Sequence, residues 1–345
     1  MMKRLLTAGT TLALLLGGIA TAQATPDDAF VVTASNAPAN QLLFFSPAGV
    51  LLKAIPTQGQ GGVGGNAGGI AAGHDRIAVV NFGSGNVSVF ARDDDHQYFH
   101  LEKVIQTFGS PVSVAFGHDH LYILSTTQVE SHSVGPHGVT SSADGTTPLL
   151  HGDGTAAQVG VMTHGLVLTE KSNAIETVNL DGRGAVTGKA TLAANIPANV
   201  DAPFGLAARG DEAYVTIAHA DEISLVRNGE VLTVTGSGTQ HAPCWVALDG
   251  PFLFSANSPS HSVSRYAVYG QKIVQDAAVV AQFNGSPTDI AYHAGIAAVI
   301  DANGTVSHVS VFNVDEDGNF ALRGVATLNS RLTNGVAIVA AESAR

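Results

Sequence analysis

The sequence predicts an all-β protein: a seven-bladed β-propeller with four antiparallel strands in each blade. A short phrase, one aliphatic residue followed by Ala or Gly, returns seven times with its copies 40 to 47 residues apart. A period in the forties that is built from short strands is typical of propellers with one blade per repeat. No apolar period of 3.6 stands out after the first residues, and 39 glycines suit tight turns between short strands. The seven copies are Ile70-Ala71, Val114-Ala115, Val159-Gly160, Leu206-Ala207, Val246-Ala247, Ile290-Ala291 and Val336-Ala337.

The repeated phrase is expected to be the inner strand of each blade, strand A. In four copies a proline precedes it, as in Ala202-Pro203-Phe204-Gly205-Leu206-Ala207. Proline has no N–H and is tolerated at the first residue of a strand, where no ladder hydrogen bond is lost. The pattern therefore predicts that strand A begins at or next to this proline.

Three further strands follow strand A in each repeat. A near-continuous apolar run predicts strand B, buried between two neighbouring sheets. A run in which Ser alternates with apolar residues predicts strand C, and a polar turn such as Asn228-Gly229 leads to strand D. Examples of strand B are residues 77–81, 121–124, 213–216 and 253–257; examples of strand C are 87–90, 223–226, 263–266 and 309–312; one example of strand D is 231–234.

The two ends of the chain are expected to supply strands to the same blade. Residues 336–339 form a strand A with no successor, and residues 30–33 form a strand B with no predecessor. Residues 41–45 and 50–55 would be strands C and D of the same blade. We therefore expect the last blade to be shared between the termini, which closes the ring and removes the free sheet edges.

Residues 1–24 are expected to be a secretory signal peptide. Lys3 and Arg4 precede a mostly apolar run over residues 5–20, and Ala22-Gln23-Ala24 is a small-x-small cleavage site. The apolar run is short for a membrane span, which argues against the alternative of an uncleaved anchor. Residues 25–345 would then be a single propeller domain, periplasmic or secreted, with no membrane association after cleavage.

The charge balance limits the possible partners. The net charge is −12, and the loss of Lys3 and Arg4 takes it to −14. Nucleic acid is a poor partner for such a chain, because phosphate binding needs clustered Lys and Arg. The single cysteine, Cys244, rules out an intrachain disulfide. A small-molecule ligand or a periplasmic protein is the expected partner.

Several phrases resemble a known repeat. Ala213-Tyr214-Val215-Thr216, Ala242-Pro243-Cys244-Trp245-Val246-Ala247 and Ser255-Ala256-Asn257 resemble the YVTN-type repeat of lactonase-like seven-bladed propellers. That family includes bacterial phosphogluconolactonase and relatives of carboxymuconate cyclase. The resemblance covers about residues 29–340 and implies the propeller fold. It also implies a lactonase-type hydrolase as one possible activity.

The repeat assigns loops to two faces. Because chain direction reverses at each strand, D–A and B–C connections share one face, called here the D–A face. The A–B and C–D turns share the other, the A–B face. The ligand mouth of such propellers is expected where the loops of the D–A face meet the axis.

Several motifs that suggest cofactors have simpler explanations, and we expect neither a metal nor a cofactor. The histidines of the A–B turns are expected to be solvated turn residues. Asp315 to Asn319 lacks the full spacing of a calcium loop and predicts a hairpin turn. Gly59 to Gly64 fits G-x-G-x-x-G but lacks the strand–helix context of a dinucleotide site. The histidines concerned are His74, His118, His120, His164 and His293.

The D–A face collects polar residues that form a candidate site. Lactone hydrolysis needs a base that activates water and a donor for the oxyanion. His219 or His241 is a candidate base, oriented by Asp201 or Asp289. Capping of turns by Asx and Ser residues is the competing explanation for this polar group. The candidate catalytic residues are His219, His241 and Asp289, and the candidate substrate-binding residues are Asn81, Glu170, Lys171, Asp201, Trp245, Asn257, Asp301 and Arg331.

Three alternatives remain open. Cys244 with His241 would be a nucleophile and its base, but other repeats place Val112, Phe204 and Thr288 at the cysteine's position, which favours a buried structural thiol. The protein could instead be a non-catalytic periplasmic propeller that binds a metabolite or a partner protein. A metal-dependent hydrolase would need acids such as Glu170, Asp289 and Asp301 to converge on one ion.

Overall fold

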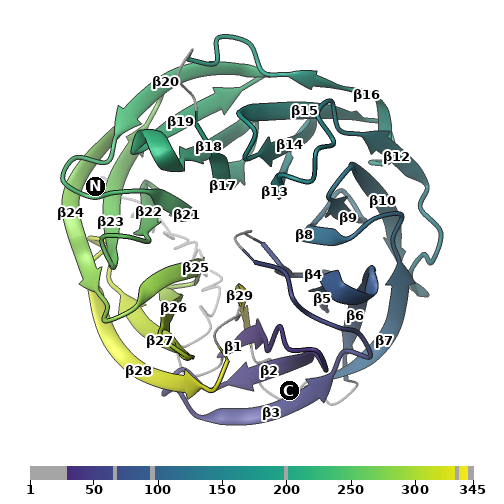
Figure 1. Cartoon of the computed structure of the whole chain (residues 1–345), viewed down its shortest axis with the longest axis horizontal. Helices are drawn as coiled ribbons and strands as arrows, with labels where there is room; N and C mark the ends of the chain where they lie inside the picture. Colours follow the sequence, from purple (N-terminus) through teal and green to yellow (C-terminus); the bar gives the residue numbers. More distant parts are fainter. Residues whose placement is uncertain (1–28, 65–67, 94–97, 198–200, 331–333, 341–345) are drawn as a thin grey trace, which may run out of the picture.

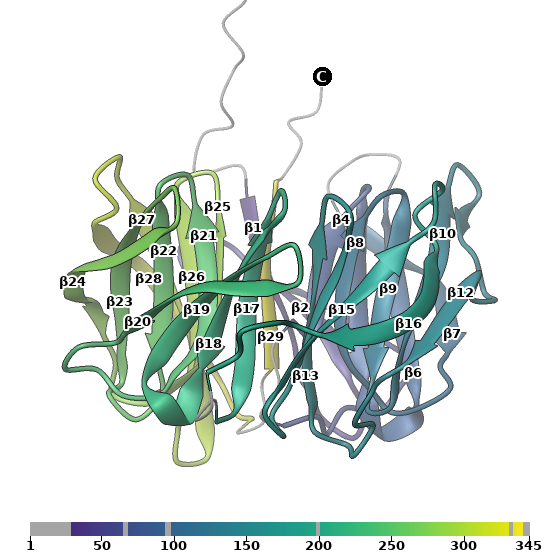
Figure 2. The same ribbon diagram turned by 90° about the horizontal axis from the view of Figure 1, so that it is seen from above.

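Seven sheets surround a common axis in the computed structural model, which describes residues 29–64, 68–93, 98–197, 201–330 and 334–340 (Figure 1). Seen from the side, the inner strands run along this axis (Figure 2). The predicted fold class is confirmed. The expected signal peptide, residues 1–24, and Arg331 lie outside the described residues. No helix within the described ranges is long and apolar enough to span a membrane.

The first four blades follow the chain in order, each with its inner strand first. Blade 1 is β4 (Ile70–Gly73), β5 (Arg76–Asn81), β6 (Asn86–Arg92) and β7 (Phe99–Gln106). Blade 2 is β8 (Pro111–Gly117), β9 (His120–Ser125), β10 (Gln128–Gly135), β11 (Gly138–Val139) and β12 (Gly145–Pro148). Blade 3 is β13 (Ala156–Met162), β14 (Gly165–Glu170), β15 (Ala174–Leu180) and β16 (Val186–Leu192). Blade 4 is β17 (Pro203–Arg209), β18 (Glu212–Ile217), β19 (Glu222–Arg227) and β20 (Glu230–Gly236).

The remaining three blades complete the ring. Blade 5 is β21 (Pro243–Asp249), β22 (Phe252–Asn257), β23 (Ser262–Tyr269) and β24 (Lys272–Gln282). Blade 6 is β25 (Ser286–His293), β26 (Ile296–Asn303), β27 (Val306–Val314) and β28 (Phe320–Leu328). Blade 7 is β29 (Asn334–Ala340), β1 (Ala29–Ala34), β2 (Gln41–Phe45) and β3 (Leu51–Pro56). Two short 3-10 turns, η1 (Phe82–Ser84) and η2 (Ala218–Ala220), lie in B–C connections of the D–A face.

Blade 7 joins the two ends of the chain, as the sequence predicts. β29 pairs with β1 in antiparallel register, with Val31 opposite Ile338 and Val32 opposite Ala337. The Thr33 hydroxyl also donates to the Gly335 carbonyl at 2.7 Å. Proline opens β8, β17 and β21, so the expected role of proline at strand A is confirmed as well.

Blade 2 departs from the simple four-stranded pattern. Its outer part is divided between the two-residue β11 and the four-residue β12, both of which pair with β10. Gly145, at the start of β12, lies so close to blade 3 that a Cβ there would be 2.2 Å from the Val186 carbonyl oxygen. The divided strand therefore packs directly against the next blade.

The core lies in the layers between neighbouring sheets. Every residue of β9 and of β14 is buried, which matches the prediction that strand B is covered on both sides. Tyr122, Tyr214 and Phe254 are among the largest fully buried side chains, and each comes from a strand B. Outer strands are less covered, and Leu322 of β28 is exposed.

The histidines of the A–B face connect blades. His118 Nε2 lies 2.8 Å from the Met162 carbonyl oxygen, and His164 Nδ1 lies 2.8 Å from Asp211 Oδ1. The expectation of a solvated turn is wrong for His120, which is the first residue of β9 and is buried. Its Nε2 lies 3.0 Å from Asp144 Oδ2. Across the described ranges no group of three His, Cys, Asp or Glu residues is placed to hold a metal ion.

Candidate functional site

Two candidate residues of the D–A face, Asn81 and Asn257, make buried hydrogen bonds within the protein. Asn81 is completely buried at the end of β5. Its Oδ1 accepts hydrogen bonds from Asn40 Nδ2 at 2.9 Å and from Thr57 Oγ1 at 2.8 Å. Its Nδ2 donates to Asn86 Oδ1 and to Ser88 Oγ, both at 2.8 Å. All four hydrogen-bonding positions of the amide are therefore occupied.

Blade 5 repeats this arrangement around Asn257, the last residue of β22. Asn257 Nδ2 donates to Ser262 Oγ at 3.1 Å and to Ser264 Oγ at 2.7 Å, and its Oδ1 accepts from Ser255 Oγ at 3.1 Å. Asn257 is fully buried. The same polar contact thus joins strands B and C in two blades, which favours the turn-capping explanation for both asparagines.

Replacing Asn81 with alanine is expected to lower the free energy of unfolding by about 2–4 kcal/mol, because four buried partners would lose their hydrogen bonds at once. Urea denaturation measures the change. Asn303→Ala, at an exposed position at the end of β26, is the matched control and should change stability by less than about 0.5 kcal/mol. Lost lactone hydrolysis with unchanged stability would instead make Asn81 a substrate contact.

Polar residues at the start of the inner strands tie neighbouring blades together. Gln158 Oε1 accepts from the Leu206 amide at 2.7 Å, and its Nε2 donates to the Leu206 carbonyl at 3.0 Å. Ser113 Oγ accepts from the Val159 amide at 3.2 Å. These side chains therefore hold the hub together at its D–A end.

Asp289 lies in this hub and is 5% exposed. Its Oδ1 accepts from the Ile290 amide at 2.8 Å. Burial raises the pKa of Asp289 to about 7, although the amides of Ile290, Val336, Gly335 and Gly68 favour the charged form. The side chain lines a central cavity of about 400 Å³ with Gln158 and Trp245. Neither His219 nor His241 is among its hydrogen-bond or ion-pair partners in the described ranges.

Trp245 and Lys171 come together around Phe204. The Phe204 and Trp245 rings form a T-shaped pair with centroids 5.3 Å apart, and both are buried. Lys171 Nζ lies 5.6 Å from the centroid of the Phe204 ring. Burial lowers the pKa of Lys171. Blades 3, 4 and 5 thus each contribute one member of a cation–aromatic cluster on the D–A face.

Glu170 is paired with a second buried carboxyl group that the sequence interpretation did not single out. Glu170 and Glu176 are both completely buried. Glu176 Oε1 accepts from the Leu150 amide at 3.0 Å, whereas the Glu170 oxygens receive no hydrogen bond from a donor group. Burial raises the pKa of Glu170 to about 8, and the neighbouring Glu176 adds to the shift. Glu170 is therefore a neutral acid at neutral pH, chiefly because it is buried.

Asp301 has a local partner too. It is 3% exposed, and its Oδ2 lies 3.2 Å from His308 Nδ1 on the neighbouring β27. Glu170, Asp289 and Asp301 come from three different blades, and they do not converge on one metal position in the described part of the chain.

Two histidine–aspartate pairs lie on the rim of the D–A face, on blades 4 and 5. His219 Nδ1 is 3.3 Å from Asp201 Oδ1, so the expected orientation of His219 by Asp201 is present. His241 Nδ1 is 2.9 Å from Asp221 Oδ2 and does not pair with Asp289. Both rings are about two-thirds exposed. Each pair leaves the ring Nε2 without a hydrogen bond to any described residue.

Additional hydrogen bonds fix the pair of His241 and Asp221. Asp221 Oδ1 accepts from the Ala242 amide at 2.6 Å, and the His241 amide donates to Ser260 Oγ at 2.8 Å. Burial alone would raise the pKa of Asp221, but the Ala242 amide and His241 keep it below its ordinary value. The carboxylate is therefore charged at neutral pH and fixes the ring through Nδ1.

The sequence interpretation missed Asp221, although a signal for it exists. Asp221 ends η2 in the left-handed conformation, with φ 56°. The equivalent turn of blade 3 has Asn173 at φ 75°, and Asn173 Oδ1 accepts from the Ala202 amide at 3.2 Å. Aligning the B–C turns would have shown an acidic residue where blade 3 has an amide. The carboxylate has a second oxygen for His241, which the amide could not provide as an acceptor.

Cys244 is a structural thiol in this arrangement. Burial raises the pKa of the Cys244 thiol to about 12, so no thiolate forms near neutral pH. The Cys244 carbonyl accepts from Thr216 Oγ1 of blade 4 at 3.1 Å. The alternative of a cysteine nucleophile loses its chemical basis.

Solved structures share this architecture at low sequence identity. The *Pseudomonas aeruginosa* periplasmic gluconolactonase PpgL is 16% identical with a TM-score of 0.64, covering 91% of this chain and 99% of that one. A *Bacteroides fragilis* protein described as a candidate 6-phosphogluconolactonase is 15% identical with a TM-score of 0.65 over the same shares. *Staphylococcus aureus* virginiamycin B lyase is 12% identical with a TM-score of 0.55, covering 79% and 92%. No protein-family profile and no curated protein matches the sequence. The chain therefore has the fold of lactonase-like seven-bladed propellers.

Proposed function

We propose that this protein is an exported hydrolase of small lactones, with its active site on the D–A rim of blades 4 and 5. The observation that carries the proposal is the pairing of His241 with Asp221, which presents a free ring nitrogen to solvent. The shared fold with PpgL, a gluconolactonase by name, supports the substrate class. Export rests on the pattern of residues 1–24.

The proposed chemistry needs only groups present on this rim. His241 Nε2 takes a proton from a water molecule as the water oxygen attacks the lactone carbonyl carbon. The carbonyl oxygen becomes an oxyanion, for which the Ser260 hydroxyl is a candidate donor, because its oxygen accepts from the His241 amide and its proton remains available. The acyl C–O bond then breaks, and the ring oxygen leaves with the proton from the imidazolium. The product is the open-chain hydroxy acid.

Lys171 and the pair of Asp201 and His219 lie on the same D–A face, on blades 3 and 4. Lys171 is a cation close to the aromatic pair of Phe204 and Trp245. A cation placed there would attract an acidic substituent of the substrate or the carboxylate of the product. His219, whose contact with Asp201 is longer, is the second candidate base.

The purified protein should hydrolyse at least one member of a panel of five- and six-membered sugar lactones, measured as acid release at constant pH. Rates must exceed those of buffer and of heat-denatured protein. Stabilisation of the fold by a lactone that is not consumed would favour the alternative, a propeller that binds a metabolite without turnover. Such a ligand would bind in the central cavity beside Asp289. Neither His219 nor His241 lines this cavity, so binding there would not require turnover.

A further inference from the structure

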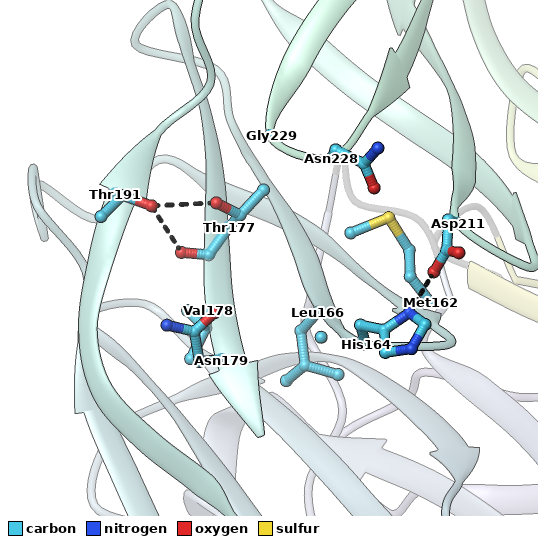
Figure 3. Close-up of a pocket in the computed structure, with 11 residues that line it drawn as sticks. Met162, His164, Leu166, Thr177, Val178, Asn179, Thr191, Asp211, Asn228 and Gly229 are labelled. Carbon is cyan, nitrogen blue, oxygen red and sulfur yellow. Dashed lines mark hydrogen bonds and ion pairs between the residues drawn. The ribbon is translucent and has the colours of Figure 1, made fainter. Parts of the chain in front are cut away.

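A second cavity lies between blades 3 and 4, at the outer rim towards the A–B face, and it has a volume of about 360 Å³ (Figure 3). Thr177 and Thr191 of blade 3 stand on one side of it, and His164, Asp211 and Asn228 stand on the other, with Leu166 at its base. It is separate from the histidine pairs of the D–A rim, because its walls are A–B and C–D turns and the strands next to them.

The cavity lies next to Thr177, a polar residue at a position that is apolar in several other blades. Thr177 pairs with Val167, and the equivalent register positions in blades 1, 4 and 6 are Val89, Leu225 and Val311. Those three side chains are completely buried in the layers between blades. In blade 3 a shorter, polar side chain takes this place, and the space next to blade 4 stays open. Blades 2 and 5 also have a polar residue at this position, Ser131 and Arg265. Ser131 Oγ accepts a hydrogen bond from the Val186 amide of blade 3 at 3.0 Å, so in blade 2 this side chain contacts the next blade directly.

The wall that carries His164, Asp211 and Asn228 is fixed from outside. Asn228 and Gly229 form a two-residue hairpin turn with positive φ at both positions, 52° and 72°. The Ala194 amide donates to the Gly229 carbonyl at 2.7 Å, so the turn of blade 4 is tied to blade 3. On the same wall His164 and Asp211 join the two blades at 2.8 Å. This wall can therefore meet a ligand with little rearrangement.

We propose that this cavity binds a small neutral polyhydroxylated molecule, such as a monosaccharide or a cyclic polyol. The Asn179 and Asn228 amides, which have no side-chain partner in the described ranges, offer a donor and an acceptor each. A charged ligand is disfavoured, because the two titratable side chains of the lining, His164 and Asp211, are already paired with each other. The size falls within the range of small-molecule pockets, about 300–1,000 Å³.

The apolar part of the lining fits the same ligand class. Met162, Leu166 and Val178 close the inner side of the cavity. The C–H faces of a sugar ring would pack on these side chains while its hydroxyl groups reach the amides and threonines. A flat apolar ligand would leave the amides without partners, at a cost for each unpaired group.

Saturation-transfer NMR with D-glucose and myo-inositol as neutral probes and D-gluconate as a charged probe tests the proposal. We expect the part of the signal that Thr177→Leu removes to be larger for at least one neutral probe than for gluconate, which the proposed active site also binds. Thr177→Leu introduces the residue that blade 4 has at the equivalent position, Leu225. The larger side chain should fill the cavity and abolish the signal. Asn228→Gly removes one amide, keeps the positive φ of the turn and should weaken binding about fivefold or more.

Two controls separate this site from the proposed active site and from misfolding. Thr187→Val, at an exposed position of β16 outside the cavity, should leave the signal unchanged. His241→Ala should also leave it unchanged, whether or not the protein hydrolyses lactones. No signal from either neutral probe, or an equal signal in the folded Thr177→Leu variant, would overturn the proposal.

Discussion

His241→Ala is expected to lower kcat/KM for lactone hydrolysis by about 10²–10⁴-fold, the usual contribution of a general base. The reason is geometric. Asp221 holds the ring through Nδ1 at 2.9 Å and leaves Nε2 directed to the solvent of the D–A face. Initial rates on the best lactone of the panel, with the wild type and the variant at matched concentrations of folded protein, measure the change.

Two companion variants sharpen this prediction. Asp221→Asn keeps a side chain of the same size but removes the charge that stabilises the imidazolium, and it should cost about tenfold or more. His219→Ala should cost less than about tenfold, since its contact with Asp201 is longer, at 3.3 Å. If His219→Ala abolished activity and His241→Ala left it intact, the base would be His219. If both variants were fully active, the base would lie elsewhere.

Glu170→Gln is expected to make the protein more stable than the wild type at alkaline pH, by about 2–4 kcal/mol at pH 9. The pKa of Glu170 rises from its ordinary 4.5 to about 8 on folding, because of burial and the nearby Glu176. The folded state thus holds this proton more tightly than the unfolded state. The stability it contributes is complete below pH 4.5 and falls by about 1.4 kcal/mol per unit as the pH rises towards 8.

Urea denaturation between pH 5 and pH 9 measures this difference. Glutamine cannot lose a proton, so the gap between variant and wild type should widen through that range and then level off. Glu316→Gln, in the exposed hairpin after β27, is the matched control and should follow the wild type at every pH. A constant gap between Glu170→Gln and the wild type would contradict the raised pKa of Glu170.

The sequence was sufficient to predict the fold because the repeat defines the strands of each blade. Each strand A begins with a comparable phrase, and strand B is apolar on both sides because a sheet covers each side. The closing of blade 7 also followed from two incomplete repeats at the two ends. The divided outer strand of blade 2 could not be foreseen in this way, because it depends on the packing of Gly145 against Val186 in another blade.

The sequence could predict which face of the propeller carries the candidate site, but not which of its side chains are accessible. Repeat position placed His219 in a B–C connection and His241 in a D–A connection, and both lie in these connections in the structure. It could not tell side chains that face solvent from side chains that face a neighbouring strand. Asn81 and Asn257 are therefore inside the blades, and Glu170 and Asp289 are buried. The partner of His241 was missed because Asp221 belongs to a turn of the preceding blade.

A crystal structure with D-gluconate, the open-chain product of the simplest sugar lactone of the panel, tests the proposed site most directly. The account predicts that the carboxylate lies on the D–A rim, within hydrogen-bond distance of His241 Nε2 and the Ser260 hydroxyl. Gluconate bound in the central cavity beside Asp289, with the rim of blades 4 and 5 empty, would contradict it.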